Sequence, residues 1–238
     1  MSIKAVLFDL DGTLLPMEQG FFVKAYFGLL ARHLAPRGYE AERLYEVLWS
    51  GVTAMVKNDG SRKNEDAFYE EFVRAYGEES IQDKPYIDQF YEKDFNRVKE
   101  VCGYSPKAKE IVELVRKMGK QAILATNPLF PQQATKNRMG WAGLQPTDFD
   151  GYTTYENCHY CKPNPKYYEE ILEGLGLKPK ECIMVGNDVE EDMIPATGLG
   201  MQVFLLTDCL INKNHRDISV YPQGNYEDLR VYLTEMLA

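Results

Sequence analysis

Short, almost uninterrupted apolar runs recur along this chain of 238 residues, with amphipathic helical patterns between them. We interpret as strands the runs at residues 3–9, 121–126, 182–186 and 202–206, and a weaker run at about 149–154. A strand that is apolar on both faces is typical of a parallel sheet covered on both sides. Strands that alternate with helices favour right-handed crossovers in such a sheet. We therefore predict an α/β fold, a parallel core sheet with helices on both faces.

Between the first run and the second lie about a hundred residues with no strand-like pattern. They carry at least four apolar stripes with helical spacing: Phe22, Tyr26, Leu29 and His33; Leu44, Val47, Leu48, Gly51 and Met55; Phe68, Phe72 and Tyr76; and Ile87, Phe90, Phe95 and Val98. A crossover between parallel strands needs only one helix. We therefore predict that residues 1–16 and 100–238 form the core and that residues 17–99 form an inserted, all-helical cap domain.

The first apolar run ends in Asp9-Leu10-Asp11-Gly12-Thr13. Open α/β sheets bind their ligands beyond the carboxyl ends of the strands. Two carboxylates that leave a buried strand two residues apart are costly to hold together without a cation. Gly12 would let the backbone turn sharply and approach a ligand. The pattern indicates an acidic, cation-dependent site at the end of this strand.

Polar groups follow three further strand or turn positions. They are Thr126-Asn127-Pro128, Lys162-Pro163-Asn164-Pro165 and Gly186-Asn187-Asp188 with Asp192 four residues on. Each has an ordinary interpretation: a turn, a surface lysine, and acidic residues that favour a helix N-terminus. A hydroxyl, backbone amides and a lysine at strand ends could equally hold an anion. The pattern alone leaves these alternatives open.

The order of these motifs resembles that of the haloacid dehalogenase-like superfamily of phosphohydrolases. The resemblance covers residues 1–16 and 100–238, and Phe8-Asp9-Leu10-Asp11-Gly12-Thr13-Leu14 is its most specific part. It implies a Rossmann-like core whose cap is inserted after the first strand. It also implies Asp9 as the nucleophile and a metal ligand. Asp11 would bind the metal through its carbonyl and act as general acid and base, with Gly12 and Thr13 in support.

The remaining motifs acquire roles through the same resemblance. Thr126 and the amide of Asn127 would bind the transferring phosphoryl group, and Lys162 would neutralise it. Asp188 would be the third protein ligand of the metal, and Asp192 would bind metal-site water or orient Lys162. Asn187, which stands between Gly186 and Asp188, departs from the commonest glycine-aspartate form of the motif.

Magnesium suits this set of groups, because it takes carboxylate and carbonyl oxygens and keeps waters for a substrate phosphate. We expect a Mg²⁺-dependent phosphomonoesterase that acts on a small phosphorylated metabolite through an aspartyl-phosphate. Alternatives are a phosphomutase of the same fold, a hydrolytic dehalogenase, whose branch lacks the second aspartate, and a non-catalytic binding protein. The sequence does not identify the substrate, and the polar turn Asn58–Lys63 is either a solvated loop or a substrate contact.

The formal net charge of −9, with no basic stripe, disfavours nucleic acid as a partner. No apolar run approaches the roughly 20 residues that span a bilayer. Met1-Ser2-Ile3-Lys4 leads directly into an apolar run without a secretory cleavage site, and the five cysteines indicate reduced thiols. We therefore expect a cytoplasmic monomer or homodimer without membrane contact.

Overall fold

A computed structural model describes residues 2–238 and contains one parallel sheet of six strands. The strands are β1 (Ala5–Phe8), β2 (Gln121–Leu124), β3 (Gly151–Tyr152), β4 (Cys182–Gly186), β5 (Gln202–Leu206) and β6 (Gln223–Gly224). Their order is β3-β2-β1-β4-β5-β6, and every neighbouring pair is parallel. The predicted α/β fold is confirmed. Only the two-residue strand β6 was not predicted, because it has no apolar run.

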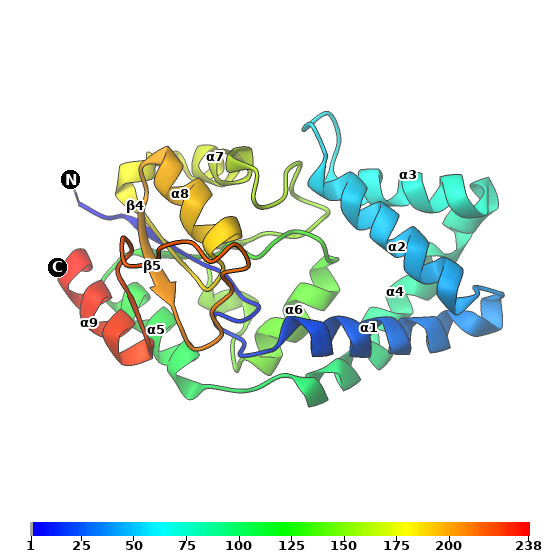
Figure 1. Cartoon of the computed structure of the whole chain (residues 1–238), viewed down its shortest axis with the longest axis horizontal. Helices are drawn as coiled ribbons and strands as arrows, with labels where there is room; N and C mark the ends of the chain where they lie inside the picture. Colours follow the sequence, from blue (N-terminus) through cyan, green and yellow to red (C-terminus); the bar gives the residue numbers. More distant parts are fainter. Residues whose placement is uncertain (1) are drawn as a thin grey trace.

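Side chains of the sheet alternate between two apolar clusters. Val6 and Phe8 of β1 pack with α5 (Pro106–Lys117) and α9 (Tyr226–Leu237). Ala5 and Leu7 pack with α7 (Pro165–Leu175) and α8 (Ile194–Leu199). Figure 1 shows these two pairs of helices on opposite faces of the strands. Both faces are covered, which explains why the strands read as continuous apolar runs.

The chain between β1 and α5 is helical and extends away from the sheet as a second lobe (Figure 1). Its elements are α1 (Gln19–Leu34), η1 (Ala35–Arg37), α2 (Ala41–Val56), α3 (Asn64–Tyr76), η2 (Glu78–Asp83), α4 (Lys84–Glu92) and η3 (Asp94–Val101). The first three predicted stripes are confirmed as α1, α2 and α3. The fourth divides between α4 and the 3₁₀ helix η3. The division of the chain into a core and a cap domain at residues 16–17 and 99–100 stays a prediction.

The two connections between the lobes run side by side. Met17 and Cys102 form an antiparallel bridge, and the amide of Gly103 donates to the carbonyl of Pro16 at 2.7 Å. The helical segment therefore leaves and rejoins the core at adjacent points.

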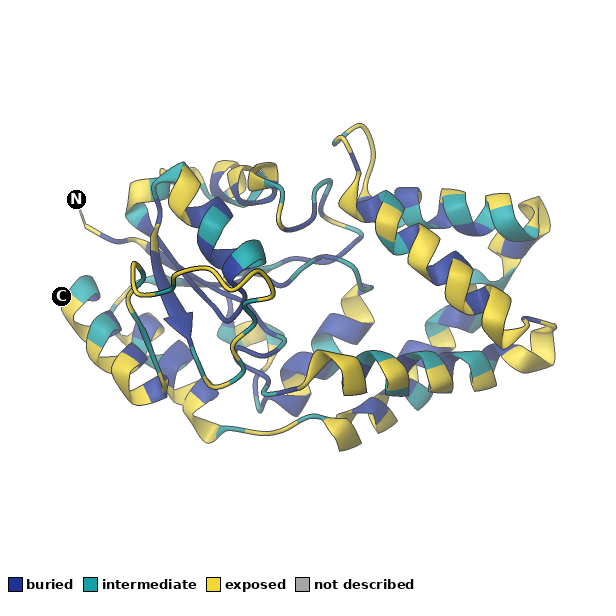
Figure 2. Ribbon diagram, in the orientation of Figure 1, coloured by how far each residue is buried: buried dark blue, intermediate teal, exposed yellow. Residues whose placement is uncertain are grey.

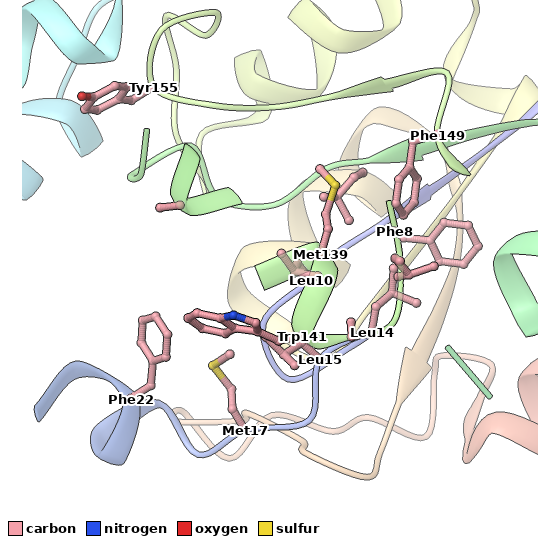
Figure 3. Close-up of a cluster of buried hydrophobic side chains, with 14 of the residues drawn as sticks. Phe8, Leu10, Leu14, Leu15, Met17, Phe22, Met139, Trp141, Phe149 and Tyr155 are labelled. Atoms are coloured by element: carbon pink, nitrogen blue, oxygen red, sulfur yellow. The ribbon is translucent and has the colours of Figure 1, made fainter. Parts of the chain in front are cut away.

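The apolar core continues from the sheet into the helical lobe. Figure 2 shows a buried stripe along the inner faces of the lobe's helices, and Figure 3 shows Phe22 of α1 and Met17 beside Trp141. Trp141 ends α6 (Gln132–Trp141), and its ring centroid lies 5.0 Å from that of Phe95 in η3. We did not predict α6, because its short sequence has almost no amphipathic periodicity. The two lobes thus share one continuous set of buried side chains.

Close helix packing in the lobe depends on Gly51 of α2. A Cβ atom at this position would lie 2.4 Å from the Phe68 ring of α3, closer than carbon atoms can approach. The glycine therefore allows α2 and α3 to pack together. The remaining short elements are η4 (Pro146–Asp148), η5 (Pro179–Glu181) and the π-helix η6 (Val189–Met193).

Candidate active site

A cavity of about 350 Å³ lies at the carboxyl ends of the central strands and faces the helical lobe. Its lining includes six of the residues predicted to form the site: Asp9, Asp11, Thr126, Asn127, Asp188 and Asp192. The strands β1 and β4 are adjacent and pair Phe8 with Val185. This register brings the acidic motifs that follow the two strands to the same edge of the sheet.

Lys162 is buried beneath this cavity, with 1% of its side chain exposed. Its ammonium donates to Asp9 Oδ1 at 2.8 Å and to Asp192 Oδ1 at 2.6 Å. Burial alone would lower the pKa of this lysine, but the carboxylates of Asp192 and Asp9 raise it well above its usual range. Lys162 is therefore a fixed positive charge beside Asp9.

Asp192 is the buried ion-pair partner of Lys162. Burial raises the pKa of its carboxyl to about 7, although the Lys162 ammonium acts in the opposite direction. Its second oxygen, Oδ2, accepts from the amide of Asp188 at 3.1 Å. Of the two roles expected for Asp192, orienting Lys162 corresponds to a direct contact. Binding metal-site water stays a prediction.

Thr13 and Asn187 connect the two acidic strand ends. Thr13 Oγ1 lies 3.1 Å from Asp9 Oδ2 and 3.0 Å from Asn187 Oδ1. Asn187 Nδ2 donates to the carbonyl of Cys209 at 2.6 Å. Gly12 has a φ of +88°, and a Cβ there would lie 2.3 Å from Asn187 Nδ2. The unexpected asparagine is thus a tie between the strand ends, and it requires glycine at position 12.

Asp188 caps the helix η6 and also lines the cavity. Its Oδ1 accepts from the amides of Glu190 and Glu191 at 2.8 and 3.0 Å. Acidic side chains stabilise helix N-termini in this way. Helix capping, the ordinary interpretation of this motif, therefore accounts for Oδ1 of the Asp188 carboxylate. Oδ2 makes no hydrogen bond to any residue in the range 2–238.

Asp11 is paired with a residue that the sequence analysis missed. Arg138 of α6 is fully buried, with 0% of its side chain exposed, and its guanidinium binds Asp11 Oδ2. The guanidinium also lies 4.5 Å from the centre of the Phe130 ring. Burial raises the pKa of the Asp11 carboxyl, and Arg138 opposes that shift. A single arginine in a weakly patterned segment gave no signal for this role.

Thr126 and Asn127 are fixed by contacts around the end of β2. The Thr126 carbonyl accepts from Tyr167 Oη at 2.9 Å. Asn127 Oδ1 accepts from the amide of Lys162 at 3.2 Å, and its Nδ2 donates to Glu191 Oε2 at 2.9 Å. Glu191, a further cavity residue that was not predicted, has its pKa raised by burial.

The acidic residues around the cavity match the ligand preference of magnesium. Asp9, Asp11 and Asp188 offer only hard carboxylate and carbonyl oxygens, as Mg²⁺ requires. Asp11 Oδ1 is buried without a hydrogen-bond partner among residues 2–238. No three acidic, histidine or cysteine side chains in that range converge on a point that would hold a metal ion. The oxygen donors and the unpartnered Asp11 Oδ1 fit the chemistry of the metal, and the predicted ligand set stays a prediction.

The turn Asn58–Lys63 does not line this cavity. A Cβ on Gly60 would lie 2.0 Å from Tyr160 Oη, so the turn packs against the core loop before Lys162. The next residue, Asn64, continues this contact: its amide donates to the carbonyl of Cys158 at 2.9 Å, and its side chain donates to Cys161 Sγ at 3.2 Å. The turn and Asn64 form a second junction between the lobes.

Comparison with known proteins identifies the family. The sequence model of the haloacid dehalogenase-like hydrolases matches residues 3–200, which is most of the chain. The chain belongs to this family of hydrolases, and the predicted resemblance is confirmed.

Two groups of named relatives are phosphatases. A glyceraldehyde 3-phosphate phosphatase of Methanopyrus kandleri is 27% identical over 84% of this chain and 82% of its own. One from Methanothermobacter thermautotrophicus is 35% identical, but the match spans only 30% of this chain and 35% of that one. Pyrophosphatase PpaX of Bacillus cereus is 24% identical over 84% of this chain and 81% of its own. The prediction of a phosphate-ester hydrolase agrees with these names.

Solved structures support the fold. A phosphatase from Thermococcus onnurineus has a TM-score of 0.58 at 21% identity and covers 97% of this chain and 98% of its own. A 2-haloacid dehalogenase from Pseudomonas syringae has a TM-score of 0.66 at 19% identity, with 98% and 99% covered. At these identities the likeness is one of architecture. Among residues 2–238, no helix has the length and apolar character that crossing a membrane requires.

Proposed function

We propose that this protein is a magnesium-dependent phosphomonoesterase that acts through an aspartyl-phosphate on Asp9. The observation that carries the proposal is the setting of the Asp9 carboxylate. One of its oxygens is held by the Lys162 ammonium and the other contacts the Thr13 hydroxyl, in a cavity that Asp11 also lines. A carboxylate positioned beside a fixed cation and a second carboxyl group is suited to attack an anionic phosphate ester.

In the first step, a carboxylate oxygen of Asp9 attacks the phosphorus atom. The bond between phosphorus and the ester oxygen breaks, and its electron pair goes to the leaving oxygen. Asp11 gives that oxygen a proton, so the alcohol departs neutral. The pKa of the Asp11 carboxyl, which burial raises, favours the protonated form that this step needs. Lys162 balances negative charge on the phosphoryl oxygens.

In the second step, water hydrolyses the aspartyl-phosphate. Asp11, now ionised, takes a proton from the water while the water oxygen attacks phosphorus. The bond from phosphorus to Asp9 breaks, which restores the carboxylate and releases inorganic phosphate. One residue thus supplies the acid of the first step and the base of the second.

Asp9, the carbonyl of Asp11 and Asp188 would hold the metal. When bound, Mg²⁺ screens the repulsion between the Asp9 carboxylate and the phosphate and stabilises charge on the phosphoryl oxygens. Thr126 and the amide of Asn127 would orient those oxygens from the end of β2. Residues 17–99 would form a cap domain over the site. The names of the phosphatase relatives support a small phosphorylated metabolite as substrate.

Trapping the covalent intermediate tests this proposal. Asp11→Asn keeps the backbone carbonyl but removes the base of the second step. With an activated aryl phosphate, which needs no proton on its leaving group, we expect turnover to fall by about 10²–10⁴-fold. A phosphoryl adduct should then appear on the peptide that contains Asp9 when the quenched protein is analysed by mass spectrometry. Asp9→Asn should form no adduct. An adduct elsewhere, or normal turnover by Asp9→Asn, contradicts the assignment.

A further inference from the structure

A second cavity, of about 120 Å³, lies inside the helical lobe next to the candidate active site. Its walls come from α1, α2, α3 and α4, from Leu129 and Phe130 after β2, and from Tyr155 after β3. Five residues line both cavities: Val23, Trp49, Val52, Leu129 and Phe130. A single layer of side chains therefore separates the apolar interior of the lobe from the cavity that holds Asp9.

The walls of this second cavity carry no charged side chain. Nine of its sixteen lining residues are aromatic, and the others are valine, leucine or isoleucine. The hydroxyl oxygens of Tyr26 and Tyr91 are hydrogen-bonded to each other at 2.8 Å. A sugar, a carboxylate or an ammonium group placed there would lose its hydration without gaining a charged partner. An apolar group would be stabilised by leaving water.

The direction of the reaction brings the leaving group toward this cavity. Displacement at phosphorus is in line, so the leaving oxygen lies opposite the attacking oxygen. Asp9 attacks from the end of β1, and Figure 1 shows the helical lobe beyond that end of the sheet. The residues that line both cavities lie between Asp9 and the interior of the lobe. The carbon skeleton of the leaving group would thus be directed to Trp49 and Val52.

From this arrangement we propose that the preferred substrates are phosphate monoesters with a neutral aryl or compact alkyl leaving group, which occupies the cavity in the lobe. This inference rests on the proposed phosphatase function and specifies its substrate class. The volume of about 120 Å³ is of the same order as that of a dry engineered cavity, about 150 Å³, that binds benzene. Trp49 and Val52, in the layer of side chains that the two cavities share, would be specificity-determining residues.

The kinetic test compares four substrates of the wild-type protein with Mg²⁺: benzyl phosphate, glycerol 1-phosphate, choline phosphate and acetyl phosphate. The acetyl group is too small to fill the second cavity. We expect kcat/KM for benzyl phosphate to exceed that for glycerol 1-phosphate by about 10–100-fold, which is within the range that one methylene group is worth in a hydrophobic pocket. Equal or faster hydrolysis of the glycerol or choline ester would overturn the inference. If the protein hydrolyses none of the four substrates, the result instead counts against the proposed function.

Val52→Trp tests the location of the cavity. A larger side chain at the shared wall should lower the ratio of kcat/KM for benzyl phosphate to that for acetyl phosphate by at least about tenfold. The matched control is Val231→Trp on α9, where 59% of the side chain is exposed, and it should leave both rates unchanged. An unchanged ratio in a folded Val52→Trp protein would contradict the location.

A binding measurement decides the question without catalysis. The chain has two tryptophans, and Trp49 is the one that lines the cavities. Benzylphosphonate, which cannot be hydrolysed, should change the tryptophan fluorescence of the wild-type protein, and methylphosphonate should bind at least about tenfold more weakly. Trp49→Phe should abolish the signal. Equal affinity for the two phosphonates would overturn the inference even if Val52→Trp failed to fold.

Discussion

Arg138 of α6 and Asp11 at the end of β1 form a buried ion pair across 127 positions of the chain. The arginine places a fixed positive charge beside the carboxyl group that we propose as general acid and base. Burial raises the pKa of Asp11 and Arg138 lowers it, so this pair sets the pH range in which Asp11 carries a proton.

Arg138→Gln should move the alkaline limb of activity to higher pH. The glutamine keeps a hydrogen-bond donor but removes the charge, so the pKa of Asp11 rises further and the carboxyl stays protonated to a higher pH. The measurement is kcat against pH with an alkyl phosphate, whose leaving group needs a proton. Loss of one partner of a buried pair should also destabilise the fold by about 3 kcal/mol, seen as a lower Tm.

The control for this prediction is Arg116→Gln on α5. Arg116 is 42% exposed and lies 3.9 Å from its partner Asp150, so its replacement should change neither the pH profile nor the stability measurably. If the alkaline limb of the kcat profile of Arg138→Gln stays in place, or moves to lower pH, the arginine charge does not act on the general acid.

Removal of divalent metal should abolish activity. A chelator should eliminate hydrolysis of an aryl phosphate, and added Mg²⁺ should restore it. Asp188→Asn should raise the Mg²⁺ concentration needed for half-maximal activity by about tenfold or more, because the anionic ligand that we propose at this position becomes neutral. Asp217→Asn, in an exposed turn, is the matched control and should have no effect. Full activity in chelator would remove the metal from the mechanism.

Gly12→Ala should damage both folding and catalysis. Its φ of +88° disfavours any side chain, and the new Cβ would displace Asn187 and break the tie to Thr13. We expect a loss of about 1–2 kcal/mol from the backbone conformation alone, measured by urea unfolding, and a fall in kcat. Gly28→Ala is the matched control, since a Cβ there meets nothing within 4 Å and helix propensity favours alanine. A Gly12→Ala protein as stable and active as wild type would contradict the proposed tie.

Asn64→Ala should loosen the junction between the helical lobe and the loop before Lys162. The substitution removes the side-chain bonds to Tyr160 and Cys161, at 3.3 and 3.2 Å. A loss of about 1 kcal/mol corresponds to a roughly fivefold larger population of the locally open state. Hydrogen exchange of peptides from residues 155–161 should report it. Asn214→Ala, on an exposed loop, should leave that exchange unchanged. Unchanged exchange in Asn64→Ala would show that backbone contacts alone hold the junction.

The sheet and most helices could be predicted because their signals are local. The apolar run of β1, for example, follows directly from burial on both faces, as Val6 and Leu7 show by packing into opposite clusters. The short strand β6 and helix α6 carry no such periodicity, and they form only because neighbouring parts of the chain cover them. Tertiary packing decided their structure.

The candidate site was predictable where a motif marks a strand end. Asp9 and Asp188 fall in such motifs, and the parallel register of β1 and β4 brings them together. Lys162 was found from its own motif, in the loop before α7. Arg138 and Glu191 were not found, since each is an ordinary charged residue within a helical stretch. Their importance arises from what lies opposite them in space, namely Asp11 and Asn127.

The pairing of Met17 with Cys102 has a consequence for how such a protein can change. The chain leaves the core and returns to it at neighbouring points. The helical segment is therefore an insertion whose length has only a small effect on the entropic cost of closing the loop when the sheet folds. Its length and composition can therefore diverge while the strand register that aligns Asp9 with Asp188 is preserved. The residues proposed to carry the reaction lie in the core, whereas most of those proposed to set substrate preference lie in the helical segment. Exchange of this segment would therefore offer a route to new substrates.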